Sequence, residues 1–387
     1  MNLALSDEQE LLREAARGTL SRHKTLEAAR DALDGGELPD LWPTAREAGW
    51  PGLLVSDELG GAGLDAFDAM LVMEECGRVL AGVPLLGHLP ATSLLAAAAA
   101  SGAAVEGLAA LAAGERRAAF LAVRPPDDLL EQWTVDPASG AARAAAPGVT
   151  IGQDGTATVD GELWWVPDAP GADVLVGVAV TADGDPVGVA IDASADGVSI
   201  ETEKSYDATR TLGHVRLESA PATVLELAPE QLAEAWYLAQ ALLAAESIGS
   251  VERALEVSVA YAKERYTFGR AIGSYQAIKH GLTEVLRRQE NGRSLLYYAG
   301  WARRGAPAEF PLAASAARSV SSQALDFAAR EMIAVHGGIG ATWEHDAPLY
   351  FRRAELSRRL LGGSGDASGR VATQLLAVAD AAQTAAA

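Results

Sequence analysis

The chain has 387 residues, of which 49% are hydrophobic and 21% charged, a composition typical of a globular protein with two or three domains. Its formal net charge of -21 argues against a surface that binds nucleic acid by releasing counterions. The single cysteine, Cys76, excludes an intrachain disulfide and a multi-cysteine metal site, and it indicates a reducing compartment.

The N-terminus predicts a helix and not a targeting signal. Residues 1–20 have neither a basic start nor a continuous apolar run, so we expect no signal peptide and a cytoplasmic protein. Ser6 and Gln9 have the spacing of a capping box, and the apolar positions Leu11, Leu12 and Leu20 follow it. A helix is therefore expected to start here.

Helical patterns continue to about residue 117, with breaks at 35–40 and 58–65. The alanine-rich stretch 89–117 is interrupted by glycine, serine and glutamate, so it predicts soluble helices and no membrane span. We predict an N-terminal all-helical domain at 1–117.

Residues 118–225 change from a helical to an alternating period. Short apolar or alternating runs are separated by the turn sequences at 154–155, 183–186 and 196–197. This pattern predicts a central antiparallel, β-barrel-like domain at 118–225.

Helical periodicity returns at 226–387, for example at Val251, Leu255, Val259 and Ala262. We expect long antiparallel helices that form a four-helix bundle. The order of helices, sheet and bundle predicts an α+β chain of three domains.

The first candidate binding motif is ERYTFGRAIGSYQAIKHGLTEVLRR at 264–288. Arg265 offers donors suited to a pyrophosphate, Phe268 can stack on a heterocycle, and Gln276 adds an amide for a ribose or adenine edge. Gly269 allows the backbone to turn. The alternative is a solvated cationic helix face with Phe268 as a core anchor.

The second motif is VHGGIGATWEHDAPLYFRRA at 335–354. Gly337 and Gly338 let backbone amides approach an anionic group closely, although such a pair can also be a simple turn between helices. His336, Glu344 and His345 lack the spacing of a zinc-binding His-Glu-x-x-His motif, so no metal site is expected.

Together the two motifs resemble the acyl-CoA dehydrogenase family, and the resemblance extends over all three predicted domains. It implies the acyl-CoA dehydrogenase fold and an FAD cofactor bound between the subunits of a tetramer. It also implies oxidation of the Cα–Cβ bond of an acyl-CoA, in which a carboxylate removes the α proton and the β hydrogen leaves as hydride. The acceptor of the electrons would be of the electron-transfer flavoprotein type.

The resemblance also implies which residues bind the cofactor. Five residues match family positions that hold the adenosine pyrophosphate half of an FAD sited mainly in the neighbouring subunit. They are Arg265, Phe268, Gln276, Gly337 and Gly338. Trp165 matches the aromatic residue that packs beside the flavin in the family.

The chain departs from the family pattern in its central domain. The segment 118–133 lacks the Thr/Ser-Glu-Pro and Gly-Ser-Asp sequences that bind flavin and substrate. Pro167 stands where a flavin-bonding threonine is common, so a hydroxyl and a backbone N–H are both lost. Ala334 replaces the usual glutamine before the glycine pair. These departures indicate a degraded flavin pocket in this subunit.

The catalytic base of the family is also missing. One branch of the family places it at the position of Leu361 or Gly362, and the other at Ala239. The remaining candidates are Glu246, two helical turns beyond Ala239, and Asp366, on a glycine-rich loop. The alternative for both is structural, with Glu246 a buried hydrogen-bonded or substrate-pocket residue and Asp366 a helix cap.

A chain with an adenosine-binding half and no base resembles one subunit of the heterotetrameric acyl-CoA dehydrogenases that actinobacteria use on steroid side chains. The first hypothesis is therefore a subunit that acts with a homologous catalytic chain on a bulky acyl-CoA. The second is a self-sufficient homotetramer with an unusual base. The third is a structural or acyl-CoA-binding homologue without redox activity.

Overall fold

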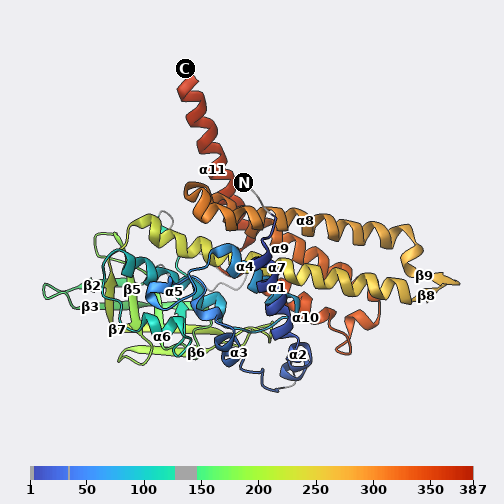
Figure 1. Ribbon diagram of the computed structural model, residues 1–387, viewed down its shortest axis with the longest axis horizontal. Coiled ribbons are helices and arrows are strands. Elements are labelled where there is room, and N and C mark those ends of the chain that lie inside the picture. Colours follow the sequence, from blue (N-terminus) through green and yellow to red (C-terminus); the bar gives the residue numbers. More distant parts are fainter. Residues whose placement is uncertain (1–3, 34, 127–145, 387) are drawn as a thin grey trace.

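The computed structural model describes residues 4–33, 35–126 and 146–386, and side chains up to residue 377. Helices come first, strands follow and helices return, as expected for this α+β chain (Figure 1). The domain boundaries that we propose, at 117/118 and 225/226, fall between the last element of one group and the first of the next.

The N-terminal region is helical. Ser6 Oγ accepts a hydrogen bond of 3.2 Å from the Gln9 amide, and Gln9 Oε1 accepts one of 3.1 Å from the Ser6 amide, which confirms the capping box. The helices are α1 (Asp7–Leu20), α2 (Thr25–Leu33), α3 (Trp42–Glu47), α4 (Ala66–Arg78), α5 (Leu85–Ala100) and α6 (Leu108–Ala112). Within the described residues, none of the helices combines the length and apolar character needed to cross a bilayer.

The central sheet contains β1 (Ala118–Phe120), β2 (Gly148–Ile151), β3 (Ala157–Pro167), β4 (Val174–Val180), β5 (Pro186–Asp192), β6 (Val198–Thr202) and β7 (Leu212–Leu225). Strands β4, β2, β3, β7 and β5 pair in that order, and β5 pairs with β4, so these strands close into a ring. Most pairings are antiparallel, but β1 and β2 each pair with β4 in parallel. The expectation of an antiparallel domain was wrong at these two pairings. Other strands lie in the chain between β4 and each of these two, so neither is joined to β4 by the hairpin turn that makes neighbouring strands antiparallel.

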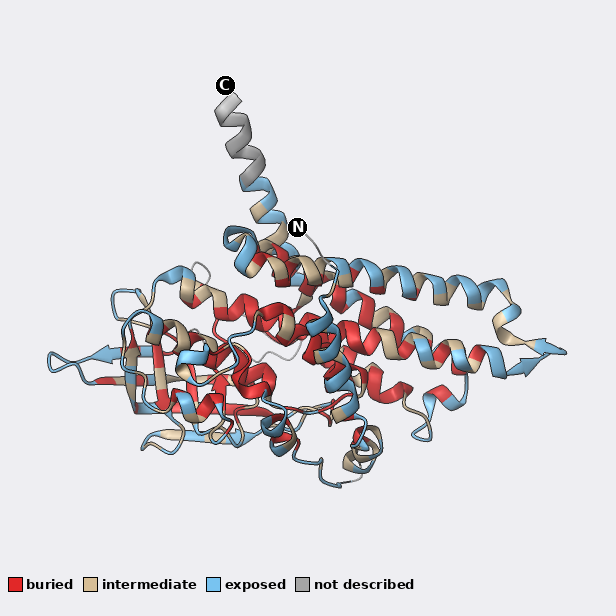
Figure 2. Ribbon diagram, in the orientation of Figure 1, coloured by how far each residue is buried: buried red, intermediate tan, exposed pale blue. Residues whose placement is uncertain are grey.

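The C-terminal helices are α7 (Pro229–Glu264), α8 (Gln276–Gly305), α9 (Phe310–His336), α10 (Ala347–Ser357) and α11 (Gly363–Ala386). The 36 residues of α7 extend about 54 Å. This helix packs against α8, α9 and the N-terminal helix α4. Buried residues follow the inner sides of α7 and α9, while α8 has an exposed outer face (Figure 2).

Two glycines allow α4 and α7 to cross closely. A Cβ atom on Gly77 would overlap the carbonyl of Glu246, and one on Gly249 would overlap the carbonyl of Glu74. Ser250 Oγ donates a hydrogen bond of 2.8 Å to the Gly77 carbonyl at the same crossing. The N-terminal helices and the bundle therefore share one tightly packed contact beside Glu246.

Candidate functional site

The first predicted binding motif forms a short hairpin, β8 (Tyr266–Thr267) and β9 (Arg270–Ala271), at the far end of the α7–α8 pair (Figure 1). Helix α7 ends at Glu264 because Arg265 takes an extended conformation, with φ -80° and ψ 122°. Phe268 and Gly269 have φ values of 48° and 80°, the combination that a tight two-residue hairpin turn requires.

The hairpin presents Phe268 to solvent. Its side chain is 92% exposed, so the alternative in which Phe268 anchors the core is wrong. Arg265 and Gln276 are exposed too, and the Arg265 carbonyl accepts a hydrogen bond of 2.8 Å from the Ile272 amide. An exposed aromatic ring beside a guanidinium and an amide can bind a planar, charged group that a second chain carries.

The glycine turn lies at the same end of the bundle. Gly337 and Gly338 follow the end of α9, both are exposed, and a Cβ on either would meet no heavy atom within 4 Å. The rings of Tyr261 and His336, whose centroids lie 4.3 Å apart, join the ends of α7 and α9. Open space over a glycine pair leaves its backbone accessible to an anionic group.

Trp165 lies elsewhere in the chain. It is half-buried on β3, at an irregularity where the pairing with β7 shifts between Leu163 and Val166, and its φ is 60°. Strand β3 and the β8–β9 hairpin lie toward opposite ends of the molecule (Figure 1). One chain therefore does not bring Trp165 together with Arg265 and Phe268.

The two family positions for the base meet in space, but neither carries an acid. Gln240, the neighbour of Ala239 on α7, donates a hydrogen bond of 2.6 Å from Nε2 to the carbonyl of Leu361. Ala239 and Leu361 are both buried. The buried Arg318 of α9 donates to the Leu360 carbonyl at 3.0 Å, so this loop is fixed from a second side.

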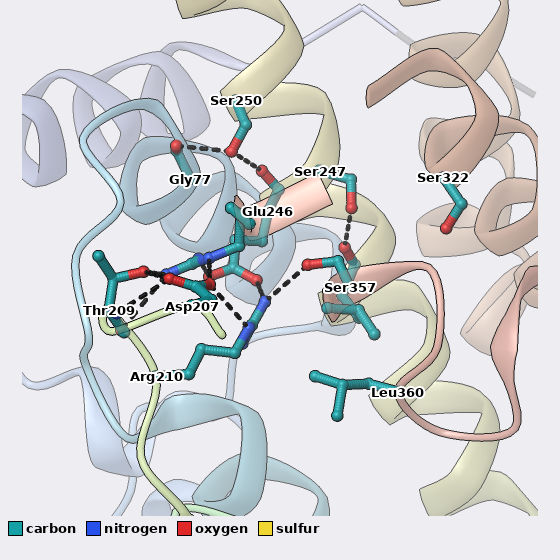
Figure 3. A network of polar contacts seen from close by, with 12 residues as sticks. Gly77, Asp207, Thr209, Arg210, Glu246, Ser247, Ser250, Ser322, Ser357 and Leu360 are labelled. Atoms are coloured by element: carbon teal, nitrogen blue, oxygen red, sulfur yellow. Dashed lines mark hydrogen bonds and ion pairs between the residues drawn. The ribbon is translucent and has the colours of Figure 1, made fainter. Parts of the chain in front are cut away.

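Glu246 is the centre of a buried ion network (Figure 3). Its side chain forms ion pairs with Arg210, through one carboxylate oxygen, and with Arg353, through the other. Arg353 Nε also donates to Asp207 Oδ2 at 2.6 Å, and its guanidinium bonds Thr209. Because two guanidinium groups hold both Glu246 oxygens, the geometry favours the structural interpretation of this residue over the catalytic one.

Asp366 lies in the first turn of α11, and not on a loop as the sequence suggested. Its carboxylate forms ion pairs of 3.1 Å with Arg124 and 3.3 Å with Arg370. A Cβ on Gly362 would lie 2.8 Å from Asp366 Oδ2, so this carboxylate sits beside the family position for the base. Arg124 belongs to the segment that binds flavin in the family; residues 127–133 of that segment lie outside the described residues.

Sequence analysis missed Asp168, which directly follows Pro167. Its Oδ2 accepts a hydrogen bond of 2.7 Å from the Gly87 amide, in the first turn of α5. Burial raises the pKa of the Asp168 carboxyl to about 7. The signal available in the sequence was an acidic residue directly after the apolar run at 163–167.

Backbone strain marks the same region. Four residues other than glycine have positive φ angles in the segments that the family uses for flavin and base: Ala122 at 55°, Trp165 at 60°, Asp168 at 61° and Leu361 at 51°. Such conformations are costly and gather at functional sites. These four residues therefore mark the segments in which a functional role is to be tested.

Comparisons with known proteins agree with this geometry. The family models "Acyl-CoA dehydrogenase, N-terminal domain" and "Acyl-CoA dehydrogenase, C-terminal domain" match residues 6–114 and 232–376. Acyl-CoA dehydrogenase IpdE2 of Mycolicibacterium smegmatis is 31% identical over 92% of this chain and 96% of its own.

Acyl-CoA dehydrogenase FadE34 of Mycobacterium tuberculosis is 34% identical over 94% of this chain, which matches only 47% of that protein's length. The solved structure of a variant of the Tcur3481-Tcur3483 steroid ACAD superposes with a TM-score of 0.82 at 26% identity. The superposition covers 97% of this chain and 99% of that one.

Proposed function

Since the chain belongs to the acyl-CoA dehydrogenase family, we propose that it is the subunit that completes the FAD site of a homologous catalytic chain. The observation that carries this proposal is the exposed hairpin around Phe268. A ring that is 92% exposed in a folded chain has no internal packing role, and Arg265, Gln276 and the glycine pair lie at the same end of the bundle.

The residues of this chain fit one half of the cofactor and not the other. At the exposed end, the Arg265 guanidinium can pair with a pyrophosphate and the Gly337 backbone can approach it. At the flavin end, Pro167 offers no N–H, and the Arg124–Asp366 ion pair links the flavin-binding segment to the base position. FAD, when bound, supplies the acceptor for the hydride.

We propose that the substrate is a bulky acyl-CoA of the kind derived from a steroid side chain. The name of the structurally similar Tcur3481-Tcur3483 steroid ACAD includes the word steroid, which supports this substrate class. The same name joins two designations, which supports a pair of different chains. An electron acceptor of the electron-transfer flavoprotein type and a cytoplasmic location complete the proposal. Cys76 is free and buried, which is compatible with a reducing compartment.

The test is to purify the chain alone and after co-expression with a homologous chain, and to measure flavin absorbance and mass. We expect colour, and a tetramer that turns over acyl-CoA, only when the partner is present. A chain that is yellow by itself and oxidises acyl-CoA would overturn the proposal.

One observation favours a second candidate, the self-sufficient homotetramer. Asp366 Oδ2 lies beside Gly362, where one branch of the family has its base. Its two arginine partners hold the carboxylate in place and favour a structural role. Turnover by the chain alone that is lost on Asp366→Asn would establish this candidate in place of the first.

A further inference from the structure

Three aromatic rings contact one another at the start of the glycine turn. The centroids of Tyr261 and His336 lie 4.3 Å apart, and those of His336 and His345 lie 4.0 Å apart. His336 is the last residue of α9 and is only 4% exposed. The three rings therefore join α7 to the connection between α9 and α10, which contains Gly337 and Gly338.

Backbone groups fix the proton positions of both imidazoles. His336 Nδ1 lies 2.7 Å from the Met332 carbonyl, and this nitrogen carries a proton because a carbonyl can only accept. His345 Nδ1 accepts a hydrogen bond of 3.0 Å from the Ala347 amide, the first amide of α10, so this nitrogen has no proton. The neutral form of each ring satisfies these contacts.

A further proton on either ring would disturb this arrangement. His336 Nε2 is buried and has no hydrogen-bond partner among the described residues, so an N–H there would lack an acceptor. A proton on His345 Nδ1 would displace the hydrogen bond from the Ala347 amide. Two charges on rings this close would also repel each other. The folded contacts therefore disfavour the imidazolium form of both histidines.

The charged groups beside the pair leave this preference in place. Asp346, which follows His345, forms an ion pair with Arg30 of α2, so a negative and a positive charge act on the rings together. Tyr261 of α7 adds a ring and no charge near neutral pH. Burial lowers the pKa of His336 and of His345 from the usual value of 6.5. Both rings are therefore neutral at neutral pH and take up a proton only in acid.

We propose that His336 and His345 form a pH-sensitive latch on the glycine turn. While both rings are neutral they hold the connection 337–346 in place, and a proton on either ring releases it. The two histidines are positioning residues, because they act on the cofactor through the backbone of Gly337 and Gly338. The effect on flavin rests on the proposed function, but the latch belongs to this chain alone.

The first measurement is hydrogen exchange of the full chain without flavin, at about pH 7.5 and about pH 5.5, on either side of the usual histidine pKa of 6.5. The stability that the latch contributes is fully present above pH 6.5, and it is lost as the pH falls through the lower pKa values of the folded state. Protection factors of the amides in 337–347, corrected for the intrinsic exchange rate, should fall by about tenfold in acid, as one pKa unit of coupling gives.

Two variants remove the titrating nitrogens and keep the contacts. In His345→Asn, the side-chain oxygen can still accept from the Ala347 amide. In His336→Phe, an aromatic ring remains beside Tyr261. The double variant should have equal protection at both pH values, and each single variant a smaller change than the wild type. His23→Asn, in the connection between α1 and α2, is the matched control and should lose protection as the wild type does.

The second measurement is the flavin that the co-expressed pair retains after dialysis at the same two pH values. The wild-type pair should retain about tenfold less flavin at the lower pH, and the double variant should retain equal amounts. Asp168 is present in every protein compared, so its own titration cancels.

Two results would each overturn the inference: wild-type protection that is unchanged in acid, or a loss that is as large in the double variant. A pair without flavin at either pH, in which this chain still loses protection in acid, contradicts the proposed function alone. A flavin-loaded pair with equal retention and equal protection at both pH values contradicts this inference alone.

Discussion

Gln240 Nε2 donates a hydrogen bond of 2.6 Å to the Leu361 carbonyl, and this contact brings the two alternative base positions of the family together. Ala239 is next to the donor on α7, and Leu361 carries the acceptor. Because both side chains are buried and apolar, a proton acceptor at this point must come from a different residue or a different chain.

Glu246→Gln should destabilise the chain by about 3–5 kcal/mol, because it leaves Arg210 and Arg353 buried without their shared carboxylate. Urea unfolding measures the change. The control is Glu201→Gln, whose exposed pair with Arg216 should change stability by less than about 1 kcal/mol. Full stability combined with lost turnover would instead identify Glu246 as the base.

Asp366→Asn should leave turnover by the paired enzyme unchanged while lowering its stability by about 1–3 kcal/mol, since the ion pair with the buried Arg124 is lost. The readouts are steady-state oxidation of an acyl-CoA and thermal unfolding of the same preparation. A large fall in kcat with an unchanged unfolding curve would contradict a structural role for Asp366.

Phe268→Ala should reduce the flavin retained by the pair by about tenfold, with no change in unfolding of the isolated chain, because the ring is exposed. Flavin absorbance after dialysis measures the retention. Leu11→Ala, at an exposed apolar residue of α1 outside both binding motifs, is the control and should retain flavin fully. Equal retention by both variants would refute the role of Phe268.

Gly77→Ala should destabilise the chain by about 1–3 kcal/mol or more, because the added methyl group meets the Glu246 carbonyl. Gly365→Ala, in α11, has open space around the new methyl and should be neutral or slightly stabilising. Denaturant midpoints compare the two. Similar midpoints would mean that α4 and α7 do not cross as closely as described.

Asp168→Asn should flatten the dependence of stability on pH. The folded pKa of about 7 lies above the unfolded value of 3.8, so the protonated carboxyl is favoured by folding. This stabilisation is fully present below pH 3.8 and is lost as the pH rises through about 7.

The amide of Asp168→Asn keeps a hydrogen-bond acceptor for Gly87 and has no charge to bury. The variant should therefore exceed the wild type in stability by about 1 kcal/mol or more above pH 7, with a smaller difference at lower pH. Asp183→Asn, in an exposed turn, is the control and should follow the wild-type profile. Parallel profiles for all three proteins would contradict the assignment.

The sequence by itself determined what depends on neighbouring residues. The capping box of Ser6 and Gln9, the helical and alternating periods, and the turn at Gly269 are local, since each is decided by side chains within a few positions. Family resemblance added the residues that we propose bind the cofactor, because these occupy short motifs.

The tertiary structure alone decided which distant charges meet. Asp207 lies in the connection between β6 and β7, Glu246 in α7 and Arg353 in α10, and no local spacing pairs them. The same holds for the parallel pairing of β1 with β4 and for the ion pair of Asp366 with Arg124. A buried charge is stable only beside a partner, and that partner is selected by the packing of the whole chain.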